Sequence, residues 1–126
     1  MRHYPGRTVL LIDDDTQHLK LQARTLSKAG FRTITTLVGS NMVGFHEHEH
    51  PDVIVLDYRL NSSLTSPQVA SLIRQTFPDT PLLVMSNLPA MPRDIAHLAD
   101  GFVPKGNDDA LIATIRRLLR VRQDAA

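Results

Sequence analysis

The sequence lacks several features that would direct its interpretation at once. It contains no cysteine, which excludes disulfide bonds and thiol chemistry. No apolar run approaches the length of a transmembrane helix, and the first seven residues lack the apolar core of a secretory signal. A strong charge of either sign is also missing, because the formal net charge at pH 7 is only +1. Overall charge therefore gives no reason to expect binding to nucleic acid or membrane. These absences predict a cytoplasmic protein.

What the chain does contain is enough for one folded domain. It has 126 residues, of which 42% are hydrophobic and 21% are charged, an ordinary balance for a globular protein. No internal repeat, linker or low-complexity segment interrupts it. We therefore expect a single domain over residues 1–126, with short tails at 1–7 and 122–126.

Short segments rich in apolar residues predict five β-strands. Three of them are almost continuously apolar, which is typical of parallel strands that are buried on both faces. Two weaker strands are also expected: one segment is rich in β-branched threonine, and the other is short. The three strong segments are Thr8–Ile12, Val53–Leu56 and Leu82–Met85, and the two weaker ones are Arg32–Leu37 and Gly101–Pro104.

Helical spacing fills the gaps between these strands. Leu19, Ala23 and Leu26 share one helix face, and Gly30 lies where that helix should stop. A further helix over Ser40–His48 is weakened by its glycines. Because strands alternate with helices, the pattern predicts repeated βαβ units and a doubly wound α/β fold with a parallel sheet.

Two later helices carry recognisable start signals. Ser66 is predicted as an N-cap followed by proline, and Asn107 as the N-cap of the last helix. Asp108 and Asp109 then fall in the first turn, where the helix dipole favours acids. The predicted apolar stripes are Val69, Leu72, Ile73 and Phe77 in one helix, and Leu111, Ile115 and Leu118 in the other.

Five polar residues follow the apolar runs directly. They are Asp13, Asp14, Asp57, Ser86 and Lys105. If each run is a parallel strand, their side chains emerge at one edge of the sheet, where open α/β sheets place their sites. Three carboxylates, a hydroxyl and an ammonium group at one edge suit a magnesium ion and a phosphoryl group.

The order and spacing of these segments resemble a response-regulator receiver domain of two-component signalling. The segments are TVLLIDDD, KAGF, PDVIVLDYRL, PLLVMSN and ADGFVPK, spread over almost the whole chain. The resemblance implies a flavodoxin-like or CheY-like three-layer sandwich with a five-stranded parallel sheet in the order 2-1-3-4-5 and five helices. It also implies a phosphorelay phosphoprotein that takes a phosphoryl group from a histidine kinase onto an aspartate.

Carried over position by position, the resemblance assigns Asp57 as the phosphoacceptor. Asp13, Asp14, Asp57 and the main-chain carbonyl of Arg59 would hold Mg²⁺, or Mn²⁺ in its place. Carboxylates repel one another when crowded, and a bound cation keeps them ionised.

Three further residues receive roles from the same resemblance. Lys105 would act as a fixed positive charge beside Asp57 and then beside the phosphoryl oxygens. Ser86 would donate its hydroxyl to a phosphoryl oxygen, and Phe102 would change rotamer as Ser86 moves. The output surface would comprise the fourth helix, fifth strand and last helix, which carries Arg116, Arg117, Arg120 and Arg122.

The chain departs from the family pattern in two places. Asn61 and Thr65 replace a usual proline and glycine after the acceptor, so the loop there is expected to differ. Asn87 replaces a small residue, and Pro89 and Pro92 fall inside a span that is short by roughly one helical turn. The fourth helix is therefore expected to be short, displaced or absent.

Two alternative functions follow from these residues. A degenerate receiver would be a constitutive protein-interaction module. A small haloacid-dehalogenase-type phosphatase would use Asp13 as nucleophile and Asp15 as general acid. Ser86 and Lys105 would bind the phosphate, and Asp108 or Asp109 would be the metal ligand. That alternative leaves Asp57 without a role, and Gln17 stands where the phosphatase pattern expects Thr or Val.

Other local patterns have simpler explanations. His46–His50 contains the letters of a zinc-protease motif, but Pro51 follows at once and a solvated helix end is the better interpretation. The arginines near the end are most simply the polar face of the last helix, with partner docking as a second possibility.

The expected partners follow from the receiver resemblance. They are a histidine kinase or phosphotransfer protein and an unknown effector, with no direct nucleic-acid binding, no membrane, and a monomer or weak dimer. The chain suits a stand-alone regulator, the N-terminal part of a longer one, or a domain of a hybrid kinase.

Overall fold

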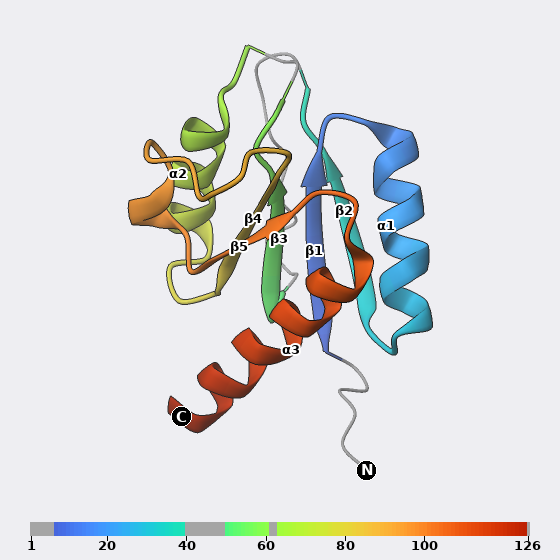
Figure 1. The fold of residues 1–126 in the computed structure, drawn as a ribbon. Helices are drawn as coiled ribbons and strands as arrows, with labels where there is room; N and C mark the ends of the chain where they lie inside the picture. Colours follow the sequence, from blue (N-terminus) through green and yellow to red (C-terminus); the bar gives the residue numbers. More distant parts are fainter. Residues whose placement is uncertain (1–6, 40–49, 61–62, 126) are drawn as a thin grey trace.

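The computed structural model describes residues 7–39, 50–60 and 63–125. The elements are β1 (Thr8–Asp13), α1 (Thr16–Lys28), β2 (Arg32–Leu37), β3 (Val53–Asp57), α2 (Ser66–Thr76), β4 (Leu82–Ser86), the single 3₁₀ turn η1 (Ala96–Leu98), β5 (Gly101–Pro104) and α3 (Asp108–Ala125). Among these residues an α-helix follows β1, β3 and β5, as the sequence predicted, whereas only a 3₁₀ turn separates β4 from β5 (Figure 1). The predicted helix over Ser40–His48 lies outside the described residues.

The five strands form one parallel sheet in the order β2-β1-β3-β4-β5, which confirms the predicted topology. The register aligns the carboxyl ends of the strands. Ile12 pairs with Leu56, so the next residues, Asp13 and Asp57, are neighbours across β1 and β3. At the other side, Ser86 at the end of β4 pairs with Pro104. The predicted polar edge therefore exists.

Helices cover both faces of the sheet, with α1 and α3 on one side and α2 on the other (Figure 1). Side chains alternate between the two faces along each strand, as the pleat of a β-strand requires. Asp13 and Asp57 continue the alternation of the residues that face α1 and α3. Those residues are Val9, Leu11, Val53, Val55, Leu83, Met85 and Val103, whereas Leu10, Ile12, Ile54, Leu56, Leu82 and Val84 face α2.

The start and stop of α1 follow the local sequence signals. Asp15 is the N-cap, and its carboxylate accepts hydrogen bonds from the main-chain N–H groups of Gln17 at 3.0 Å and His18 at 3.3 Å. Gly30 has φ of 99°, a left-handed conformation that side chains disfavour, just beyond the helix end at Lys28. The cap leaves His18 at the third position of the helix, close to the end of β1.

The predicted cap of α2 was wrong by one residue. Thr65 is the N-cap: its hydroxyl accepts from the N–H of Gln68, and the side chain of Gln68 accepts from the N–H of Thr65 at 2.8 Å. Ser66 is the first helical residue instead, and its hydroxyl donates back to the carbonyl of Tyr58. Leu72, predicted on the buried stripe, is 37% exposed.

The last helix begins as predicted. Asn107 accepts a hydrogen bond from the N–H of Ala110 at 3.0 Å, which makes it the N-cap. The predicted stripe of Leu111, Ile115 and Leu118 is buried against the sheet. Arg116, Arg117 and Arg120 are exposed, which fits the polar-face interpretation.

The connection between β4 and β5, residues 87–100, contains no α-helix. Its one regular element is η1, so the fourth helix that the resemblance implied is absent, as the prolines and short span predicted. The end of this connection is tied to α2 by Arg74. Its guanidinium donates to the carbonyls of Leu98 and Thr80, at 2.8 Å and 2.6 Å, and pairs with Asp100 at 2.6 Å.

Among the described residues there are therefore three α-helices, where the resemblance implied five. None of the described helices is long and apolar enough to cross a membrane.

Candidate functional site

Asp57 lies at the end of β3 and is almost completely buried, with 1% of its surface exposed. Each of its two carboxylate oxygens has a defined partner. Oδ2 accepts a hydrogen bond from Nζ of Lys105 at 2.7 Å, and Oδ1 accepts one from the main-chain N–H of Arg59 at 3.0 Å. A buried carboxylate is costly unless it is paired and hydrogen-bonded, and Lys105 supplies the compensating charge.

Asp13 is the second buried carboxylate, with 2% of its surface exposed. Its Oδ1 accepts hydrogen bonds from the N–H groups of Asp14 at 2.7 Å and Asp15 at 3.3 Å. Burial raises the pKa of Asp13 from 3.8 to about 6; the hydrogen bond from His18 opposes this rise, and the nearby charge of Asp57 adds to it. Without a bound cation, the Asp13 carboxyl therefore resists ionisation.

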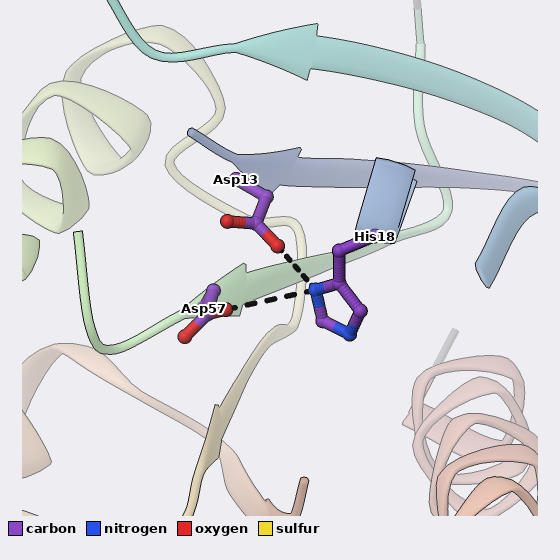
Figure 2. Close-up of side chains that lie close together, drawn as sticks. All are labelled: Asp13, His18 and Asp57. Atoms are coloured by element: carbon purple, nitrogen blue, oxygen red, sulfur yellow. Dashed lines mark hydrogen bonds and ion pairs between the residues drawn. The ribbon is translucent and has the colours of Figure 1, made fainter. Parts of the chain in front are cut away.

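His18 is the site residue that the sequence interpretation missed. Its Nδ1 contacts Oδ2 of Asp13 and lies 3.7 Å from Oδ2 of Asp57 (Figure 2). The sequence held a signal for it. An aspartate N-cap at position 15 places residue 18 in the first turn of α1, beside the end of the preceding strand.

The donor set at this edge suits a divalent cation. Asp13, His18 and Asp57 each offer one ligand atom, and these atoms all lie within 4.8 Å of one another. Asp14 is not part of this cluster; its side chain is half-buried, and its role as a ligand stays a prediction. The carbonyl of Arg59 is likewise a predicted ligand only.

Ser86 and Lys105 are neighbours at the ends of β4 and β5. The N–H of Lys105 donates to the carbonyl of Ser86 at 2.8 Å, while the Ser86 hydroxyl accepts from the N–H of Leu88 at 3.0 Å. Ser86 follows the alternation of Leu82 and Val84, and half-buried Phe102 also packs on the α2 side. The switch roles predicted for Ser86 and Phe102 are not tested by these contacts.

A further contact joins the acceptor strand to the β4–β5 connection. Tyr58 directly follows Asp57, and its phenol donates to the carboxylate of Asp94, with both oxygens at 3.0 Å. Partial burial and this carboxylate raise the pKa of the Tyr58 phenol. The sequence interpretation did not identify this pair, because nothing local relates residues 58 and 94.

Of the residues that the phosphatase alternative requires, Asp13, Ser86 and Lys105 lie at this edge, but its general acid and its additional metal ligand are not in the cluster around Asp13. Asp15 caps α1 through its carboxylate, and Asp108 and Asp109 are exposed in the first turn of α3. The zinc-protease motif predicted not to be functional falls on residues 46–50, of which 46–49 lie outside the described part of the chain.

Comparison with known proteins agrees with this fold. The family model described as "Response regulator receiver domain" matches residues 9–116, so the chain belongs to that family. It is 31% identical to the transcriptional regulatory protein PrrA of Mycobacterium tuberculosis, over 94% of this chain and 52% of PrrA. The chain thus spans about half the length of that relative.

Solved structures share the fold. The chemotaxis response regulator CheY4 of Vibrio cholerae superimposes with a TM-score of 0.77 at 22% identity, over 90% of this chain and 98% of CheY4. The response regulator DrrB of Thermotoga maritima, an OmpR/PhoB homolog, gives 0.73 at 26% identity, over 93% of this chain and 54% of DrrB.

The protein is therefore a receiver domain of the two-component response regulators, with the CheY-like fold that the sequence predicted. Receiver domains interact with histidine kinases or phosphotransfer proteins. Neither the interaction-module nor the phosphatase alternative is favoured by these findings.

Proposed function

We propose that this domain accepts one phosphoryl group on Asp57 from a histidine kinase or phosphotransfer protein, with a divalent cation bound, and thereby changes its binding to an effector. The observation that carries the proposal is the buried Asp57 carboxylate with the Lys105 ammonium at 2.7 Å from its Oδ2. A buried nucleophile held beside a fixed positive charge has what phosphoryl transfer requires of the protein, namely position and charge stabilisation.

In the proposed reaction one bond breaks and one forms. The phosphorus–nitrogen bond of a phosphohistidine breaks, and a bond forms between phosphorus and a carboxylate oxygen of Asp57. The imidazole leaves with the electron pair of the broken bond and takes a proton from solvent. Lys105 neutralises charge on the transferred phosphoryl oxygens, while the N–H of Arg59 holds the carboxylate in place.

The ligand atoms at the site fit a cation. Asp13 and Asp57 are its proposed ligands on the contacts described above, and Asp14 and the Arg59 carbonyl are proposed on the resemblance. When bound, a divalent cation neutralises phosphoryl charge and keeps the crowded carboxylates ionised.

The same proposal includes the response to phosphorylation. Ser86 and Phe102 are proposed to rearrange on the α2 side, as receiver switches do, and to alter the surface seen by the effector. We further propose that residues 1–126 form one receiver domain that is a monomer or weak dimer. The relative PrrA is named a transcriptional regulatory protein, so an effector that controls transcription is one candidate.

The test is chemical phosphorylation followed by intact mass. The phosphoryl donor is phosphoramidate, a small molecule with a phosphorus–nitrogen bond. The protein is incubated with it in the presence of Mg²⁺, and its mass is compared with that of untreated protein. We expect a gain of one phosphoryl group, and no gain in Asp57→Asn. Asp79→Asn is the matched control, because Asp79 is exposed in the turn between α2 and β4, at the opposite edge of the sheet.

The outcomes separate the alternatives. Labelling that survives in Asp57→Asn but is lost in Asp13→Asn would favour the phosphatase chemistry over the receiver. An absence of labelling in all folded variants, with far-UV circular dichroism unchanged, would leave only the interaction module.

A further inference from the structure

His18 supplies one of the three potential ligand atoms of the proposed cation site. The residue enters from the first turn of α1, and its Nδ1 lies between the two buried carboxylates (Figure 2). Nδ1 contacts Oδ2 of Asp13 and is 3.7 Å from Oδ2 of Asp57. An imidazole nitrogen is therefore one of three ligand atoms that converge there.

The carboxylates are oriented toward this nitrogen by the main chain. Oδ1 of Asp13 is held by the N–H of Asp14 at 2.7 Å, and Oδ1 of Asp57 is held by the N–H of Arg59 at 3.0 Å. These bonds leave Oδ2 of Asp13 to the imidazole, whereas Oδ2 of Asp57 lies between the imidazole and Nζ of Lys105, which donates to it at 2.7 Å. The convergence is thus built into the ends of β1 and β3 and does not depend on exposed, mobile side chains.

The identity of the donor atoms determines which cations bind best. Carboxylate, carbonyl and water oxygens suit Mg²⁺, whereas imidazole nitrogen suits transition metals such as cobalt, nickel and zinc. Resting on the proposed function, we propose that His18 is a metal ligand of this site and makes it prefer transition-metal divalent ions to Mg²⁺. The divalent ions bound beside Asp57 would then differ from those bound by a site made of oxygen ligands alone.

Two competing roles for His18 make different predictions. As a counter-charge only, the imidazole would exclude cations, and its removal would strengthen binding of every divalent ion. Alternatively, the ring could turn away from the carboxylates, since it is 22% exposed and borders a cavity of about 340 Å³ between α1 and the start of α3. A ring that turned away would have no effect on cation binding.

The experiment measures metal binding directly, without phosphorylation. Because His46, His48 and His50 are a separate source of metal binding, all variants carry Asn at these positions. Co²⁺ and Mg²⁺ affinities are measured by titration calorimetry, a choice that suits a chain without tryptophan. Pulsed electron paramagnetic resonance of the Mn²⁺-loaded protein then reports whether a nitrogen is coordinated.

His18→Leu removes the ligand, and His18→Gln removes the imidazole but keeps a polar side chain beside Asp13. His97→Leu is the matched control, because His97 is an exposed histidine in η1. We expect the parent to bind Co²⁺ at least about a hundredfold more tightly than Mg²⁺. Both His18 variants should lose about tenfold or more in Co²⁺ affinity, with no loss for Mg²⁺. The nitrogen signal should disappear in both and persist in His97→Leu.

Three results would overturn the inference: tighter binding of both ions in the His18 variants, no change for either ion, or an equal loss for both. The proposed function is judged separately, by phosphoramidate labelling with Mg²⁺. Labelling of Asp57 without a nitrogen ligand would reject only the role of His18. A nitrogen-ligated cation in a protein that cannot be labelled would reject only the proposed phosphoryl transfer.

Discussion

The carboxyl edge of the sheet and the β4–β5 connection, residues 87–100, are built in opposite ways. At the edge, Asp13, Asp57 and Lys105 are buried or paired at the ends of regular strands, and main-chain N–H groups hold the carboxylates. The connection has one 3₁₀ turn where the family pattern implies an α-helix. It is held instead by side chains from elsewhere, chiefly Arg74 at its end and Tyr58 at Asp94.

This difference indicates which part of a receiver tolerates change. Residues at the edge must meet within a few ångströms across three strands, so each depends on the register of the sheet. The connection must only return the chain from β4 to β5, and a helix is one of several ways to do so. A helix-based output surface is therefore not expected here.

The largest effect that we expect is on the free energy of unfolding when no cation is bound at the carboxyl edge. Since the pKa of Asp13 is raised to about 6 from 3.8, the folded state holds a proton that the unfolded state releases. In chelator, the contribution of Asp13 to the free energy of unfolding should be highest below about pH 4 and should fall as pH rises toward about 6. A shift of about two pKa units corresponds to a loss of about 3 kcal/mol.

Asp13→Asn should therefore be more stable than the parent at pH 7 in chelator, by up to about 3 kcal/mol, and should lose this pH dependence. Urea denaturation at a series of pH values measures both. Asp15→Asn is the control, because asparagine caps a helix as well as aspartate does. A destabilised Asp13→Asn would contradict the prediction, and so would a parent whose stability is flat between pH 4 and 7.

Next in size is the effect of removing the positive charge beside Asp57. In Lys105→Met the rate of labelling by phosphoramidate should fall by about a hundredfold, since a preorganised charge at the reacting group is lost. Time courses of intact mass measure the rate, and Lys20→Met, an exposed lysine of α1, is the control. Labelling of Lys105→Met at the parental rate would show that the 2.7 Å contact does not contribute to the chemistry.

The smallest expected effect tests whether the two regions are independent. Arg74→Met removes the guanidinium donors to Leu98 and Thr80 and should lower the free energy of unfolding by about 1–2 kcal/mol. Hydrogen exchange should accelerate in residues 95–100, while the labelling rate of Asp57 stays unchanged. Arg93→Met, an exposed arginine within the connection, serves as the control. A parallel fall in labelling would show that the connection supports the edge.

Much of the fold could be predicted because its signals are local. Continuous apolar runs identified the strands, with Asp13, Asp57 and Ser86 at their ends, and Asn107 and Gly30 marked helix boundaries correctly. The cap of α2 was missed because Thr65 and Ser66 are chemically similar, and only the backbone conformation distinguishes them. Leu72 was misplaced because spacing alone does not decide which edge of a stripe the sheet covers.

By itself the sequence determined the order of strands and helices, the receiver family and the gathering of Asp13, Asp57 and Lys105 at one edge. The order of the elements and the shared edge follow from periodicity along the chain and from the parallel register that it implies, whereas the family followed from the resemblance of five sequence segments. Only the tertiary structure decided that His18 lies between the two carboxylates and that Tyr58 contacts Asp94. The reason is physical: these features depend on distances between side chains from separate elements, which packing sets and local sequence does not encode.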